Sequence, residues 1–220
     1  MEKQARFRLH AAVLLASVWG LSEAALGMGL RKCAAVLSGS LMTGVALLFL
    51  GAGWVLTRRY WALIVMVVIA SLFKLFDAAL LSLPILHGAV GNPIFAFFME
   101  CAALILLLAV LQKHLVQKTH GQAVLGGLSA LLAVNLFPLV RFVTGVPACV
   151  VSGTGFPLSL YYAYVAVGLS MVTVPMGFWL GERIASLETR LSSRRPGLIH
   201  VLTPAAVIIC LILVFLIRNV

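Results

Sequence analysis

Charge is scarce in this sequence, and acidic charge is the scarcest. Only 10% of the 220 residues are charged, and Asp and Glu together number 6, against 16 for Lys and Arg. A typical soluble domain has about a quarter of its residues charged. Since 63% of the residues here are hydrophobic, the chain is not an ordinary soluble domain, and we expect a single membrane domain.

Most motifs that carry chemistry are also absent. The chain has no HExxH, no GxSxG and no phosphate-binding loop of the Gly-x-x-x-x-Gly-Lys-Ser/Thr type. Its 4 cysteines form no CxxC pair and no metal-ligand spacing. We therefore predict that it is not an enzyme and has no catalytic residues, no metal site and no cofactor. Cys33 and Cys149 both fall at outer ends of predicted helices, and whether they form a disulfide is left open.

Apolar runs of the length that crosses a bilayer recur along the whole chain. A helix needs about 20 apolar residues to span the hydrocarbon core. Because the hydrocarbon offers no hydrogen-bond partners, a spanning segment must satisfy its own backbone groups, and an α-helix does so. The pattern predicts an all-α polytopic membrane bundle with six core transmembrane helices and a seventh, C-terminal one. The predicted spans are 9–30, 33–56, 60–84, 92–112, 122–145, 157–181 and 199–217.

The basic residues indicate how these helices are oriented. Lys and Arg gather at the cytoplasmic ends of membrane helices, so their net excess need not indicate nucleic acid, and we predict none as a partner. Here they fall before span one and after spans two, four and six, whereas the links after spans one, three and five hold only Arg31 and Lys32. We predict a multi-pass protein of the cytoplasmic membrane with its N-terminus in the cytoplasm. Residues 1–185 form the six-helix domain, 186–198 a basic cytoplasmic linker and 199–220 the additional helix.

Five Asp, Glu, Lys or Arg side chains lie inside the predicted spans. A charge at the bilayer centre costs about 2.5–3.5 kcal/mol on the lenient insertion scales, so such residues usually have a task. At 1.5 Å per residue, most of them lie within roughly 6–15 Å of the outer surface. They are Glu23, Lys74, Asp77, Glu100 and Arg141. Their shared depth predicts an outward-facing polar pocket, and the alternative is that they are structural ion pairs.

Particular pairings and neighbours extend this prediction. Lys74 and Asp77 are three residues apart on one helical face and can pair directly, and Glu100 and Arg141 can pair across helices. Three acids against two bases then leave one carboxylate without an internal partner. Trp19 shares a face with Glu23, and Asn135 shares one with Arg141. The candidate substrate-binding residues are Glu23, Lys74, Asp77, Glu100, Asn135, Arg141, Trp19, Tyr161 and Tyr162.

These residue types suggest the kind of ligand. The three acids would recognise cationic or hydrogen-bond donor groups, while Lys74, Arg141 and Asn135 would orient the acids or contact an anionic group. Trp19 and the tyrosines would stack on a ring. Small, amphoteric, ring-bearing solutes fit such a pocket, with thiamine-like and nucleobase-like molecules as examples.

The first span also carries small residues at every fourth position. Ala12, Ala16 and Gly20 form a stripe that permits another helix to approach closely. The neighbour is either a helix of the same chain or a partner protein.

Taken together, these motifs resemble the S components of the energy-coupling factor (ECF) transporters for vitamins and related micronutrients. The resemblance rests on Ala12-xxx-Ala16 and on Asn92-Pro93 followed by Glu100, and it covers about residues 9–183. It implies a six-helix subunit that binds a small-molecule substrate from the outside and docks through its first helix. It also implies a transmembrane coupling subunit and ATPase subunits as partners, consistent with the missing phosphate-binding loop. The seventh span departs from this family pattern.

Two other functions remain as alternatives. The first alternative is a structural, assembly or ion-handling subunit of a larger membrane complex, since polar residues also hold membrane helices together. A path for ions across the whole membrane is disfavoured because the inner half of the predicted bundle has no ionisable residue. The second alternative is an intramembrane enzyme, which the missing catalytic motifs disfavour.

Overall fold

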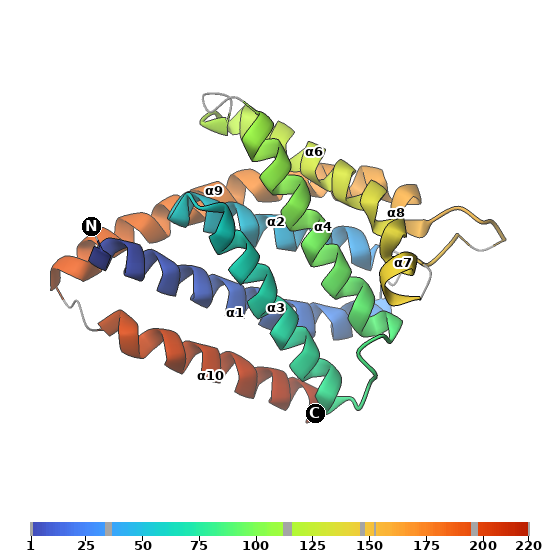
Figure 1. Cartoon of the computed structure of the whole chain (residues 1–220), viewed down its shortest axis with the longest axis horizontal. Coiled ribbons are helices and arrows are strands. Elements are labelled where there is room, and N and C mark those ends of the chain that lie inside the picture. The colour runs from blue at the N-terminus through green and yellow to red at the C-terminus, as the bar shows by residue number, and fades with distance from the viewer. Residues whose placement is uncertain are drawn as a thin grey trace.

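The structure, a computed structural model, describes residues 2–33, 37–111, 116–145, 148–151, 153–194 and 198–219, with side chains described for 7–27, 37–111, 116–145, 148–151, 153–187 and 201–219. The described residues form helices, with one isolated β-bridge between Val150 and Pro157. The helices are α1 (Glu2–Cys33), α2 (Ser38–Thr57), α3 (Tyr60–Leu80), α4 (Gly88–Val110), α6 (Thr119–Leu136), η1 (Phe137–Leu139), α7 (Val140–Thr144), α8 (Leu158–Tyr161), α9 (Ala163–Arg194) and α10 (Leu198–Asn219). They are arranged as an elongated bundle (Figure 1).

Seven stretches among the described residues are long and apolar enough to cross a membrane. The prediction of an all-α polytopic bundle is therefore confirmed, and the chain is a multi-pass membrane protein. The spans are Phe7–Gly27, Ser38–Thr57, Tyr60–Leu80, Gly88–Val110, Thr119–Thr144, Ala163–Leu187 and Val201–Asn219. With seven spans, the two termini lie at opposite ends of the bundle (Figure 1).

Several predicted boundaries are wrong by a few residues, for local reasons. Span four begins at Gly88 and not at 92, because the Nδ1 atom of His87 accepts a hydrogen bond from the Ala89 N–H (3.2 Å) and caps the helix. Span five contains the short 3-10 turn Phe137–Leu139, which holds a proline. Span six begins at Ala163 because the short helix Leu158–Tyr161 precedes it.

Close helix contacts at glycine hold one side of the bundle together. α9 packs along α2 and α6. A Cβ atom at Gly177 of α9 would lie 2.2 Å from the Leu48 carbonyl oxygen of α2, and one at Gly126 of α6 would lie 2.1 Å from the Ser170 carbonyl oxygen of α9. Since lipid is as apolar as the side chains, membrane helices are held largely by such close packing. Any side chain at these two positions would push the helices apart.

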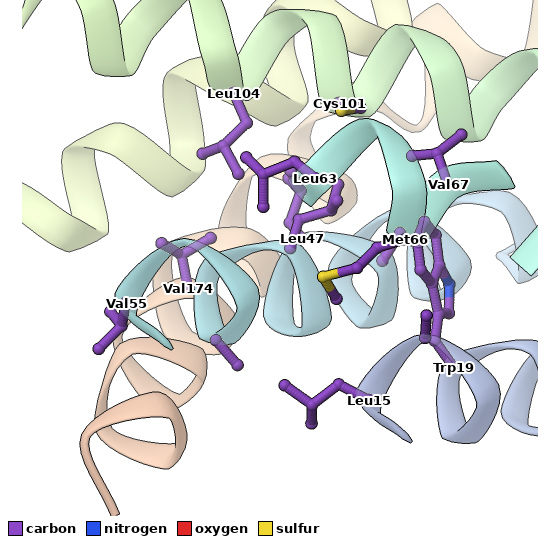
Figure 2. Packing of buried hydrophobic residues seen from close by; sticks show 14 of the residues in the cluster. Leu15, Trp19, Leu47, Val55, Leu63, Met66, Val67, Cys101, Leu104 and Val174 are labelled. Carbon is purple, nitrogen blue, oxygen red and sulfur yellow. The ribbon is translucent and has the colours of Figure 1, made fainter. Parts of the chain in front are cut away.

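The main core lies where α1, α2, α3, α4, α6 and α9 meet. Trp19 of α1 is completely buried, as are Leu47 of α2 and Met66 and Val67 of α3. Figure 2 shows the Trp19 indole extending from α1 toward Met66 and Val67. Trp19 also packs against the Phe97 ring of α4, with ring centroids 5.0 Å apart. This core fixes α1, α3 and α4 relative to one another, and these helices carry the buried charges.

The small-residue stripe of α1 is covered within the chain. Ala12 and Ala16 are 1% and 0% exposed and belong to the main core. A Cβ atom at Gly20 would lie 2.5 Å from the Cβ atom of Phe73, so the stripe allows α3 to approach closely. The stripe was expected to contact either a helix of the same chain or a partner protein, and in the structure it contacts a helix of the same chain. The three residues therefore present no open docking surface.

The seventh span, α10, lies at the edge of the bundle beside α1 and α3 (Figure 1). A small apolar cluster joins the three helices and contains Ala24, Phe73, Cys210 and Val214. Only 17% of the most apolar window of α10 is buried, the lowest share among the seven spans. With so little apolar burial, polar contacts weigh more in holding α10 to the bundle.

Candidate functional site

A cavity of about 380 Å³ lies at the end of the bundle where α1 and α3 finish and α4 begins. This volume falls within the range of about 300–1,000 Å³ that is usual for small-molecule sites. Its walls come from α1, α2, α3, α4, α6, η1, α8 and the segment before α8. The lining residues are Glu23, Gly27, Ser38, Gly39, Ser40, Met42, Thr43, Lys74, Gly88, Ala89, Asn92, Pro93, Ala96, Phe97, Glu100, Ala133, Val134, Phe137, Cys149, Leu158, Ser159 and Tyr162.

Glu100 of α4 is the carboxylate with the fewest partners in this cavity. It is 3% exposed, and the Thr43 side chain of α2 forms a hydrogen bond with it. Among the described residues, its Oε2 atom has no hydrogen-bond partner. A buried carboxylate oxygen without a partner carries a desolvation penalty that a ligand group can relieve. Glu100 is therefore the strongest candidate for a ligand contact.

Glu23 of α1 lines the same cavity and has two neighbours that stabilise its charge. Its Oε1 atom accepts a hydrogen bond from Nε1 of Trp19, one turn earlier, at 3.3 Å. The ammonium group of Lys74 on α3 interacts with it electrostatically. Glu23 also acts electrostatically on Glu100, so two acidic groups and one basic group share the cavity wall.

Asp77 of α3 is paired from the seventh helix. Arg218 of α10 donates from Nε to Oδ1 and from Nη2 to Oδ2 of Asp77, the second at 2.8 Å. The Arg218 Nη2 atom also donates to the Ala24 carbonyl oxygen at 3.5 Å. Lys74 lies 3.5 Å from Asp77 Oδ2, so the predicted Lys74–Asp77 pair is present. Asp77 itself is buried beside the cavity and is not part of its lining.

The predicted pairing of Glu100 with Arg141 is wrong. Arg141 is exposed, and its guanidinium lies over the Phe142 ring, 4.5 Å from the centroid. Asn135 is exposed as well, and its Nδ2 atom donates to the Leu131 carbonyl oxygen at 2.7 Å. The face of span five that these two residues share points away from the cavity, which is lined instead by Ala133, Val134 and Phe137.

The aromatic candidates are divided between the cavity and its surroundings. Tyr162 lines the cavity, whereas Tyr161 is 52% exposed and outside the lining. The two rings pack edge to face with centroids 4.9 Å apart. Trp19 lies behind Glu23 in the core, so it supports the carboxylate and is not placed to stack on a ligand.

Sequence reasoning missed several lining residues because they are ordinary by type. Thr43 and Phe97 are unremarkable side chains of apolar helices, and only the packing of α2 against α4 brings them to the cavity. Asn92 was noted for its place before Pro93 but not as a site residue. Its buried Oδ1 atom has no hydrogen-bond partner among the described residues. A rare amide in an apolar span was the signal available for Asn92.

The cysteines and metal-binding residue types give no further site. No cluster of three or more His, Cys, Asp or Glu side chains is placed to hold a metal ion in the described part of the chain. Cys149 is exposed at the cavity and its thiol is free. The disulfide considered with Cys33 involves a side chain that lies outside the described residues.

Comparison of the chain with protein-family models, with curated proteins and with solved structures gives no significant match. The site therefore has to be interpreted from its own geometry and chemistry.

Proposed function

We propose that this membrane protein captures a small polar solute from outside the cell, as the substrate-binding subunit of an ECF-type importer. The observation that carries the proposal is the cavity of about 380 Å³ with Glu23, Lys74 and Glu100 in its wall. Ionisable residues inside membrane spans usually mark a substrate or ion pathway. A mostly apolar pocket with a few converging polar groups is the usual form of a small-molecule site.

The direction of capture follows from the charge pattern. The excess of Lys and Arg at one set of helix ends supports a cytoplasmic N-terminus in the cytoplasmic membrane. The cavity lies at the opposite end, where α1 and α3 finish. Under this orientation the cavity faces outward, and the solute is a micronutrient taken up by the cell.

The energy for uptake comes from other proteins under this proposal. The chain lacks the phosphate-binding loop that ATP hydrolysis would require, so a transmembrane coupling subunit and ATPase subunits complete the transporter. Since the stripe Ala12, Ala16 and Gly20 is covered by the chain itself, these partners would contact other residues of the bundle.

Native mass spectrometry of the protein, purified gently from membranes of its own host, tests the proposal. We expect a small organic molecule to remain bound to the wild type and to be lost in Glu100→Gln. The control is Glu182→Gln, because Glu182 is an exposed acid of α9 far along the helix from the cavity. Copurification of ATPase subunits would support the transporter assignment directly. A wild-type chain that retains no solute and copurifies with no ATPase would refute the proposal.

The second candidate is an assembly subunit of a larger membrane complex. The Arg218–Asp77 contact is compatible with it, because this buried pair joins α10 to α3 outside the cavity lining and so belongs to helix packing, not to a solute site. In this case the same experiment would show no bound solute, and other membrane proteins would copurify with the chain.

A further inference from the structure

We infer that the cavity selects a small organic cation with N–H donors on a planar apolar body, and that Glu100 determines this preference. The inference rests on the proposed function, since it specifies the ligand class of the same cavity. It follows from a count of charges, from the supply of hydrogen-bond acceptors and from the shape of the walls.

The charge count comes first. Three carboxylates lie in or beside the cavity, Glu23, Asp77 and Glu100, and the described cations that reach them are Lys74 and Arg218. Among the described side chains, three formal negative and two formal positive charges leave one negative charge uncompensated. Arg218 pairs with Asp77 through both carboxylate oxygens, which leaves Lys74 available to balance Glu23. The uncompensated charge therefore belongs to Glu100.

The cavity also has hydrogen-bond acceptors that lack donors. Glu100 Oε2 and Asn92 Oδ1 are buried acceptors without partners among the described residues. Pro93 has no N–H, so the helical hydrogen bond that would occupy the Ala89 carbonyl is missing, and Ala89 lines the cavity.

Two hydroxyl donors of the wall are already in use. The Ser40 hydroxyl donates to the Tyr162 carbonyl at 3.1 Å, and the Ser159 hydroxyl donates to the Val134 carbonyl at 3.5 Å. Buried acceptors without partners beside these two occupied hydroxyls favour a ligand that brings its own donors.

The remaining walls determine the body of the ligand. The lining includes three aromatic residues from different elements: Phe97 of α4, Phe137 of η1 and Tyr162 beside α8. Rings bind flat apolar groups well, and a cation near their faces gains additional attraction. A planar cation such as an amidinium on a ring satisfies the acceptors and the rings together.

Three probes of nearly the same shape and different charge test the inference: benzamidinium, benzamide and benzoate. Binding would be measured by calorimetry or saturation-transfer NMR at pH 7 with the full chain in phosphatidylcholine nanodiscs. We expect benzamidinium to bind at least about tenfold more tightly than benzamide, and benzoate more weakly than either. Glu100→Gln should abolish the preference for the cation. Asp77→Asn/Arg218→Gln removes one charge of each sign, so the charge count is unchanged and the preference should persist.

Other outcomes would overturn the inference. Preferred binding of benzoate, no binding of benzamidinium, or a cation preference that survives Glu100→Gln would each contradict it. The proposed function would still stand if the wild type retained its natural solute in native mass spectrometry. If the wild type retained no solute and copurified with no ATPase, the proposed function would fail, and the inference that rests on it would fail as well. The variants are compared only where their helical content and melting temperature match those of the wild type.

Discussion

Replacing Arg218 by Gln should loosen the seventh helix from the bundle. The side chains of Arg218 and Asp77 are 8% and 3% exposed, so the pair is almost dehydrated. Removing one member of a buried ion pair costs about 3–5 kcal/mol, because the other charge stays buried without its partner. Lys74 lies 3.5 Å from the same carboxylate and compensates in part. We therefore expect a loss at the lower end of the range, about 3 kcal/mol.

This loss can be measured as a lowered melting temperature of the purified chain in detergent, followed by tryptophan fluorescence and circular dichroism. At about 2–4 °C per kcal/mol for a chain of this size, Arg218→Gln should melt roughly 6–12 °C below the wild type. Asp77→Asn/Arg218→Gln removes both charges of the pair, so neither remains buried without the other, and it should recover most of the difference, since neutral replacements of a buried pair are often well tolerated.

The matched control is Arg183→Gln on α9. Arg183 is exposed, with its guanidinium 5.4 Å from the centroid of the Trp179 ring, so we expect a change within about 0.5 kcal/mol. A single variant Arg218→Gln that melts with the wild type would refute the reasoning. So would a double variant that is as unstable as the single one, because the cost would then not come from an uncompensated charge.

Three further predictions address packing, the core and the orientation. Gly177→Ala should destabilise the fold by about 1–3 kcal/mol in the same melting assay. The control is Gly168→Ala on the same helix, which should be neutral because nothing lies within 4 Å of the new Cβ atom. Equal effects of the two substitutions would contradict the close contact at Gly177. Trp19→Phe removes the indole N–H donor to a buried carboxylate and should lower stability by about 1–3 kcal/mol, and an unchanged melting temperature would argue against that hydrogen bond. In a Cys33→Ser background, a membrane-impermeant maleimide added to intact cells should label the exposed thiol of Cys149, and labelling only after the cells are opened would reverse the predicted orientation.

The helical spans could be predicted from the sequence because hydropathy acts locally. Each span needs about 20 apolar residues whatever its neighbours are, and the seven predicted stretches agree with the seven in the structure. Boundaries were less predictable where a side chain decides them, as His87 does by capping α4. The shared depth of Glu23, Lys74 and Glu100 was also predictable, since depth depends only on the position of a residue along its helix.

Partners across helices depend on how each helix is rotated and which helices are adjacent, and only the tertiary structure decides this. Sequence reasoning paired Glu100 with Arg141, but Arg141 follows the 3-10 turn Phe137–Leu139 and lies on the exposed side. The second base near the acids comes instead from Arg218, 141 residues from Asp77.

The sequence by itself determined the class of the protein, the number of spans and the level at which its buried charges lie. The tertiary structure decided which carboxylate has no charged partner among the described residues, because α10 brings Arg218 to Asp77 and leaves Glu100 facing the cavity. Hydropathy is a sum over consecutive residues, whereas an ion pair requires two side chains to meet within a few ångströms. Only the packing of α10 against α1 and α3 fixes that meeting.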